Sequence, residues 1–453
     1  MAKLEKGSKK LLNAWAFYDW ANSVYTLTIT SSLFPIFYSA LFLTRVNASD
    51  EKIVNAFGME FKSTALITFV TAFTFLVVAF TSPLLSGIAD YVGNKKNFMK
   101  FFCYLGGLGC IGLYFFGIES SEIYYSLLFY FMGLIGYWGS LVFYNSYLPD
   151  IAYPEQQDSI SAKGFSMGYI GSVILLIINL AMVMFPDVFG FWDGQGGEEA
   201  KDIASIKAMR YSFITVGLWW IGFSQYSFYI LPQGVSTGHK VTKDVVFNGF
   251  KELKLVWNEL LLNLRLKRYL LAFFVFSMAV QTIMLVAVYF GEEEIAWASS
   301  SEKTTGLIIS ILVIQVVAIL GAYLTSKSSS KFGNIKTLIV INAIWMGLCF
   351  WGYFVETPIQ FYATAGVVGL VMGGIQSLAR STYSKFLPDT EDTTSYFSFF
   401  DVAEKIGIVI GMVIFGSIDQ ITGSMRNAFL CLFVFFLVGI VLLFRVPKKE
   451  ILN

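Results

Sequence analysis

Long apolar stretches separated by short polar segments recur along the whole chain. A helix needs about 20 apolar residues to cross a hydrocarbon core of ~30 Å. Runs of this length predict twelve membrane-spanning helices, over residues 14–43, 62–88, 97–117, 122–148, 161–185, 209–231, 269–290, 304–326, 335–355, 358–386, 395–418 and 424–445. The pattern therefore predicts an all-α integral membrane protein, embedded in a lipid bilayer.

The basic residues predict an orientation for these helices. Most of the 32 Lys and Arg residues lie in the N-terminal segment and in every second loop after it. The opposite loops carry acidic clusters instead, such as Glu292-Glu293-Glu294. Cytoplasmic loops of membrane proteins are enriched in Lys and Arg. We therefore expect both termini in the cytoplasm and a location in the cell or inner membrane.

Two stretches of the chain repeat each other. Asp90-Tyr-Val-Gly-Asn-Lys-Lys96 returns as Ser330-Lys-Phe-Gly-Asn-Ile-Lys336, and Tyr147-Leu-Pro-Asp150 returns as Phe386-Leu-Pro-Asp389. The offsets are 240 and 239 residues, so the register is nearly constant. We predict two parallel six-helix halves, over residues 1–231 and 269–453. Such repeats place a substrate path between the halves near mid-membrane and permit alternating access.

The segment 232–268 between the halves is basic and has helical periodicity. Its apolar positions alternate with Lys and Arg, and they are Phe250, Leu253, Trp257, Leu260, Leu261 and Leu264. This pattern is typical of an amphipathic helix that lies along a membrane surface. We favour a passive linker on the cytoplasmic headgroups over a regulatory element.

The composition narrows the function. Only 14% of the residues are charged, against about 25% in soluble proteins. The net charge of +1 gives no electrostatic basis for binding nucleic acid. A single histidine and four cysteines without a C-x-x-C spacing argue against a catalytic metal site. No phosphate-binding G-x-x-x-x-G-K-[ST] loop is present, which argues against an ATP-driven pump. We expect no cofactor, no enzymatic activity and a monomer.

A charged residue at the centre of a spanning helix costs at least ~2.5–3.5 kcal/mol, so each one needs an explanation. The candidates are Asp19, Arg380, Asp401, Glu404 and Lys405. Asp401 and Lys405 are four residues apart and share a helix face, so they can neutralise each other. Lys405 lies about ten residues from the cytoplasmic end, or about 15 Å deep. We favour a role for Lys405 and Glu404 in binding a substrate carboxylate or in a switching gate.

Two interpretations of Asp19 remain equally open. It accepts a proton or binds a substrate amine, or it forms a structural ion pair with Arg380 or caps its helix. Neutral polar residues on neighbouring helices are weaker candidates, because most membrane Asn and Gln side chains simply bridge helices. These residues are Tyr18, Asn22, Asn145, Gln281 and Gln376.

The loop after the second predicted helix resembles a motif of the major facilitator superfamily, Gly-x-x-x-Asp-Arg-x-Gly-Arg-Arg. Asp90, Gly93 and Lys95 match it, whereas the basic residues at positions 91 and 94 are missing. The resemblance implies the fold of that superfamily. It also implies a cytoplasmic gate loop of Asp90, Gly93, Lys95 and Lys96. In this loop Asp90 meets a helix N-terminus or an Arg, and Gly93 makes the turn. The alternative is an ordinary tight basic turn.

Four further segments are similar to the vacuolar amino-acid effluxer family, the autophagy-related branch of that superfamily. They are Trp15–Ser23, Phe143–Pro149, Gly373–Ser381 and Tyr396–Phe400 followed by Lys405. The resemblance implies efflux of amino acids. We therefore expect a secondary transporter that moves a small polar solute by alternating access, with proton coupling chemically available to its buried carboxylates. The rival interpretation is a lipid-moving or sensory membrane protein of the same fold.

Overall fold

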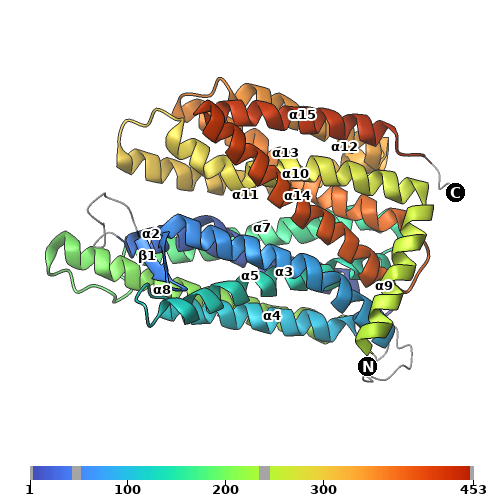
Figure 1. The fold of residues 1–453 in the computed structure, drawn as a ribbon, viewed down its shortest axis with the longest axis horizontal. Helices are drawn as coiled ribbons and strands as arrows, with labels where there is room; N and C mark the ends of the chain where they lie inside the picture. Colours follow the sequence, from blue (N-terminus) through green and yellow to red (C-terminus); the bar gives the residue numbers. More distant parts are fainter. Residues whose placement is uncertain (1–3, 43–52, 234–244, 449–453) are drawn as a thin grey trace.

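The computed structural model describes residues 4–42, 53–233 and 245–448, which are mainly helical (Figure 1). Within these ranges, nine helices are long and apolar enough to cross a membrane. A helical segment also occurs at each of the three other predicted spans: residues 9–40, Gly197–Ile230 and Thr393–Thr422. The structure confirms the helical membrane fold, and the number of twelve crossings stays a prediction.

The N-terminal half begins with a span that changes its helical type. α1 (Lys9–Val24) continues into the π-helix η1 (Tyr25–Leu33) and then into α2 (Phe34–Ala40). The remaining elements are α3 (Ser63–Val92), α4 (Lys95–Gly112) with the 3₁₀ turn η2 (Leu113–Phe115), α5 (Ile123–Asn145), α6 (Tyr147–Ile151), α7 (Pro154–Met184) and α8 (Gly197–Ile230).

One small strand pair departs from the all-α prediction. β1 (Ile53–Ala56) and β2 (Met59–Lys62) pair antiparallel, with Ile53 opposite Lys62. Phe57 and Gly58 connect them with positive φ angles of 54° and 73°, the geometry of a two-residue hairpin turn. The hairpin ends where α3 begins, so it marks the start of the second predicted span.

The second half follows a connecting helix. α9 (Val245–Leu262) precedes α10 (Leu264–Glu293), and Asn263 caps α10 by accepting a hydrogen bond from the backbone N–H of Leu266 at 3.0 Å. The further helices are α11 (Ser300–Phe332), α12 (Asn334–Gly352), α13 (Pro358–Phe386), α14 (Thr393–Thr422) and α15 (Met425–Phe444).

The helices are arranged in two bundles, with α9 at one end of the molecule (Figure 1). α3 packs on α14, and α7 packs on both α11 and α13, so these helices join the bundles. Lys95 and Lys96 begin α4 at this end, and Lys331 and Lys385 lie in the last turns of α11 and α13. We call this end of the molecule the basic end.

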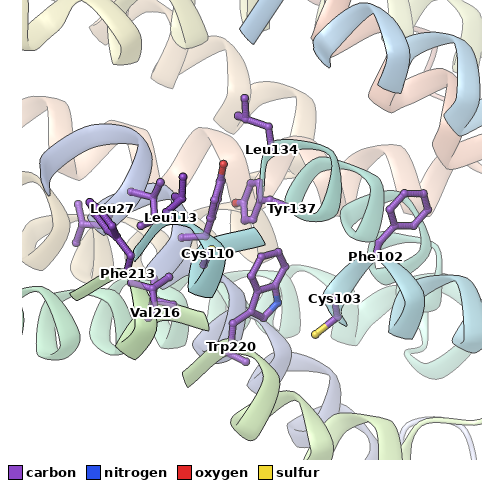
Figure 2. Close-up of a cluster of buried hydrophobic side chains, with 14 of the residues drawn as sticks. Leu27, Phe102, Cys103, Cys110, Leu113, Leu134, Tyr137, Phe213, Val216 and Trp220 are labelled. Carbon is purple, nitrogen blue, oxygen red and sulfur yellow. The ribbon is translucent and has the colours of Figure 1, made fainter. Parts of the chain in front are cut away.

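Each bundle has its own hydrophobic core. One cluster is drawn from residues between 11 and 231, and the other mostly from residues between 256 and 446. Figure 2 shows part of the first, where Trp220 of α8 lies near Tyr137 of α5 and Cys103 of α4. Gly106 and Gly136 let α4 and α5 approach closely, because a Cβ atom at Gly136 would lie 2.3 Å from the Cα of Gly106. The two cores are consistent with the predicted halves, whose boundaries stay a prediction.

α9 confirms the helix expected in the linker. Its buried face carries Val256 and Leu260, whereas Phe250, Trp257 and Leu261 are exposed. The helix lies on α3, where the backbones of Gly87 and Gly249 come so close that a Cβ atom at Gly87 would lie 2.3 Å from the Gly249 oxygen. Residues 234–244 of the linker lie outside the described residues. Its position on the headgroups stays a prediction.

Candidate functional site

An ion pair between Asp19 and Arg380 joins the two bundles. Asp19 comes from α1 and Arg380 from α13, and Arg380 Nη2 lies 3.3 Å from Asp19 Oδ2. Their side chains are only 7% and 4% exposed. The ion pair proposed from the sequence as one interpretation of Asp19 is therefore present. A role of these two residues in transport stays a prediction.

The surrounding groups satisfy both charges. The Tyr144 hydroxyl donates to Asp19 Oδ2 at 2.8 Å. Arg380 Nε donates to Ser161 Oγ at 3.0 Å, Nη2 donates to the Ser161 carbonyl at 3.0 Å, and Nη1 donates to Asn145 Oδ1 at 3.1 Å. The guanidinium also lies 4.2 Å from the ring centre of Phe165. A buried ion pair is stable only when additional hydrogen bonds support it, and here Arg380 donates to Asp19, Asn145 and Ser161 while Tyr144 donates to Asp19.

Glycines on α7 make room for this cluster. A Cβ atom at Gly164 would lie 2.5 Å from Asp19 Oδ2 and 3.1 Å from Arg380 Nη2. One turn later, a Cβ atom at Gly168 would lie 2.4 Å from Ser23 Oγ of α1. Small residues of this kind let membrane helices pack closely. The close crossing of α1 and α7 thus places Asp19 beside Arg380.

A second charged cluster lies on α14. Lys405 Nζ is 2.7 Å from Asp401 Oδ1 and 3.0 Å from Glu404 Oε2, so the neutralisation expected for Asp401 and Lys405 is observed. Gln281 of α10 donates to Glu404 Oε1 at 2.6 Å. The ammonium also lies 3.9 Å from the ring centre of Trp138, which belongs to α5 of the other bundle. Lys405 therefore contacts both bundles.

The gate loop meets the opposite bundle at the basic end. Asp90 accepts hydrogen bonds from the backbone N–H groups of Ser395 at 2.6 Å and Thr394 at 3.3 Å, at the start of α14. A helix N-terminus favours a negative charge. Gly93 ends α3 in the left-handed conformation with a φ of 70°, which a residue with a Cβ rarely adopts. The contact of Asp90 with a helix N-terminus and the turn at Gly93 are therefore present, as the resemblance implies, and the role of this loop as a gate stays a prediction.

The two lysines of the gate loop have different partners. Lys95 Nζ donates to Thr393 Oγ1 of α14 at 2.9 Å and to the Ser146 carbonyl at 3.1 Å, and it pairs with Asp150. Lys96 Nζ donates to the Leu231 carbonyl at 2.6 Å, within its own bundle. Lys95 therefore links the bundles, whereas Lys96 holds the end of α8.

The sequence did not lead us to Asp158, which forms a second contact between the bundles at the basic end. Asp158 of α7 pairs with Lys385 at 2.7 Å. It also accepts hydrogen bonds from Ser329 Oγ at 2.8 Å and Asn334 Nδ2 at 2.9 Å. The repeat contained the signal: Asn334 lies in the copy of the gate loop, and the 239-residue offset relates the start of α7 to that of α14. Each gate loop thus meets the start of the equivalent helix in the other bundle.

The neutral candidates fall into two groups. Asn145 contacts Arg380, Gln281 contacts Glu404, and the Tyr169 hydroxyl donates to Gln376 Oε1 across the bundles at 2.9 Å. Tyr18, by contrast, packs inside the N-terminal bundle, with its ring centre 5.0 Å from that of Tyr144 and 6.0 Å from that of Phe228. Asn22 is fully buried, and its Nδ2 makes no hydrogen bond within the described residues. A site role for these residues stays a prediction.

The chain matches a known family over nearly its whole length. The family model described as "Vacuole effluxer Atg22 like" matches residues 7–451. An uncharacterised MFS-type transporter, YxiO of Bacillus subtilis (strain 168), is 31% identical over 96% of this chain and 95% of its own length. Autophagy-related protein 22 of Kluyveromyces lactis is 23% identical over 96% of this chain and 92% of its own length.

Solved transporters share the fold. The chain is similar to the major facilitator transporter FucP in the outward conformation, with a TM-score of 0.67 and 14% identity over 97% of this chain and all of that one. It is also similar to the proton:xylose symporter XylE, with a TM-score of 0.68 and 12% identity over 97% of this chain and 96% of that one. These relatives are transporters and not enzymes. The chain belongs to the Atg22-like effluxer family of the major facilitator superfamily, and it is a multi-pass membrane protein that acts as a secondary transporter.

Proposed function

We propose that this transporter moves a small zwitterionic solute, an amino acid or a solute of similar chemistry, by alternating access. The observation that carries the proposal is the pairing of buried opposite charges at the seam between the bundles. A zwitterion brings one carboxylate and one ammonium. The protein already pairs a carboxylate with a cation twice, as Asp19 with the guanidinium of Arg380 and as Glu404 with the ammonium of Lys405. Such a solute competes for these pairs. Because the Asp19–Arg380 pair joins the two bundles, competition for that pair couples solute binding to separation of the bundles.

The Lys405 cluster supports coupling to a proton. It holds two carboxylates and one ammonium, so one negative charge lacks a counterpart within the triad. A buried charge without a partner is costly, which favours uptake of a proton or of a substrate amine. Glu404 is 19% exposed, against 7% for Asp401 and 1% for Lys405, so it is the most accessible of the three. We assign the coupling proton to Glu404.

The basic end is where the bundles are held together by Asp90, Asp158 and Arg380. With both termini in the cytoplasm, as the basic loops predict, these contacts would close the cytoplasmic side. The structure would then correspond to a state open to the opposite side. In this proposal, opening toward the cytoplasm requires the three carboxylate contacts to break together.

A counterflow assay tests the substrate class. The full chain is reconstituted in proteoliposomes preloaded with unlabelled amino acids, and uptake of a labelled amino-acid panel is measured. We expect saturable, time-dependent accumulation of at least one zwitterionic member. The matched control is the Lys405→Met variant in vesicles of equal protein content. Absence of saturable counterflow for every member of the panel would exclude amino acids as substrates.

A further inference from the structure

A hollow of about 470 Å³ opens on the outside of the N-terminal bundle, away from the charged clusters. It lies between α1, α7 and α8. Its walls are formed by Asn13, Phe17, Lys163, Met167, Phe223 and Tyr226, and Gly222 lies at its surface. Phe223 and Tyr226 are 38% and 44% exposed, so aromatic rings face outward in a membrane protein. We call this hollow the α1–α7–α8 groove.

The groove is mostly apolar, but one cationic side chain, Lys163, lies in it. Lys163 Nζ donates to Asn13 Oδ1 at 2.6 Å, which fixes the ammonium between α1 and α7. Among the described residues no carboxylate pairs with Lys163, and none of the groove's lining residues is acidic. Lys163 is the tenth residue of α7, about 14 Å along the helix from its start. It is also the third residue of the predicted span 161–185, so its ammonium lies near the headgroup level, where it can reach a lipid phosphate.

The aromatic wall suits an acyl chain. Phe17 of α1 packs edge-on against Tyr226 of α8, with ring centres 5.2 Å apart, and also against Phe223 at 5.9 Å. A Cβ atom at Gly222 would meet no atom within 4 Å, so the surface beside these rings is open. An apolar wall with one cation at its basic end matches an amphipathic molecule with a negative head.

We propose that the α1–α7–α8 groove binds an anionic phospholipid. Its phosphate contacts Lys163 and Asn13, and one acyl chain lies against Phe17, Phe223 and Tyr226. The outer faces of α1 and α7 line the groove, whereas the inner faces of the same helices carry Asp19 and Gly164. The lipid therefore packs against the two helices that hold the Asp19–Arg380 pair.

Native mass spectrometry of the purified full chain tests the site. The protein is equilibrated with equal amounts of phosphatidylglycerol and phosphatidylcholine, and the retained copies of each lipid are counted. We expect phosphatidylglycerol to be preferred, and Lys163→Gln to reduce the preference about fivefold, the effect of one lysine near an anionic surface. Lys331→Gln removes an exposed lysine from the basic end of α11, outside the groove, and should leave the preference unchanged.

A second variant tests the acyl-chain wall. Gly222→Phe fills the open surface beside Phe223 and should reduce retention of both lipids while Lys163 is intact. An unchanged lipid preference in Lys163→Gln would overturn the proposal, because the groove would then hold only ordinary bilayer lipid. An equal loss in Lys331→Gln would also overturn it, since the attraction would then be diffuse. Displacement of the lipid by inorganic phosphate alone would refute the part played by the acyl chain.

Discussion

At the scale of single residues, Arg380 concentrates the contacts between the bundles. Its guanidinium contacts Asp19, Asn145 and Ser161, all of which belong to the N-terminal bundle. Arg380, Asp19 and Lys405 were predictable because a charge inside an apolar run is costly and therefore conspicuous. Asp158 was not, because it lies one turn into α7 beside the polar residues of a loop, where a carboxylate is ordinary. What distinguishes Asp158 is its pairing with residues of the other bundle, and the residue type alone does not show this.

Removing the guanidinium should destabilise the protein strongly. We expect Arg380→Ala to lower the free energy of unfolding by about 3–5 kcal/mol, because it leaves the Asp19 carboxylate buried without its partner. Thermal unfolding in detergent, followed by tryptophan fluorescence, measures the effect. The Asp19→Asn/Arg380→Ala double variant removes both charges and should recover part of the loss. Equal destabilisation of the single and double variants would contradict a coupled pair.

Lys405 should matter for transport more than for folding. We expect Lys405→Met to abolish counterflow while the protein remains in the membrane. Lys405→Arg keeps the charge and serves as the matched control. Unchanged counterflow kinetics in Lys405→Met would show that Lys405 has only a structural role. Protein content of the vesicles, measured by immunoblot, separates loss of transport from loss of protein.

Glu404 should be needed for coupling transport to a proton gradient and not for solute exchange. We expect Glu404→Gln to retain counterflow, which needs no net proton movement, and to lose accumulation driven by an imposed pH gradient. The amide oxygen can still accept the hydrogen bond from Gln281. The contact with Lys405 is lost, but Lys405 keeps Asp401 as its partner. Gradient-driven uptake at the level of the unchanged protein would remove Glu404 from the coupling mechanism.

At the scale of elements, apolar run length placed the helices well but could not reveal their irregularities. The π-helix η1 and the hairpin of β1 and β2 lie at or beside runs that a regular helix would also explain. A run of apolar residues reports burial in lipid, and it does not report how the backbone hydrogen bonds are made. The crossing of α1 and α7 was hidden for a similar reason: Gly164 is one of 39 glycines, and only its neighbours distinguish it.

The α1–α7 crossing should not tolerate a methyl group. We expect Gly164→Ala to cost about 1–3 kcal/mol, because the new Cβ atom would collide with the Asp19 carboxylate. Gly366→Ala in α13 is the matched control, since its Cβ atom meets nothing within 4 Å and should be neutral or stabilising by up to about 1 kcal/mol. Melting temperatures of both variants measure the difference. Equal melting temperatures of the two variants would mean that α1 and α7 can move apart to admit the methyl group at little cost.

At the scale of the whole molecule, the gate loop and its copy at residues 330–336 both contact the opposite bundle at the basic end. The repeat in the sequence predicted related halves, and the structure places both loops against the opposite bundle. The second loop has Ser330 where the first has Asp90, so the repeat did not show that the acid of the second contact comes from Asp158 in α7. The closed arrangement itself depends on contacts between residues more than 100 positions apart, which no local pattern reports.

Breaking one gate contact should change the balance between closed and open states. We expect Asp90→Asn to weaken the contact with the start of α14 and to populate a state with a wider basic end. Spin labels at the exposed positions Lys10 and Lys331, one on each bundle, would report this as an added, longer distance. The control is Asp187→Asn, which changes an exposed acid in the connection between α7 and α8. Identical distance distributions for Asp90→Asn and the unchanged protein would contradict a gate role.

The three aspartate contacts at the seam run in one direction. Asp19, Asp90 and Asp158 all belong to the N-terminal bundle, and the groups that donate to them, Arg380, Ser395 and Lys385, all belong to the C-terminal one. Two N-terminal bundles would bring carboxylate against carboxylate, and two C-terminal bundles would leave Arg380, Lys385 and the backbone N–H of Ser395 without these acceptors. In these three contacts the N-terminal bundle is thus complementary to the C-terminal bundle and not to a second copy of itself. Although the two halves of the chain repeat each other, these three contacts can form only between one half and the other.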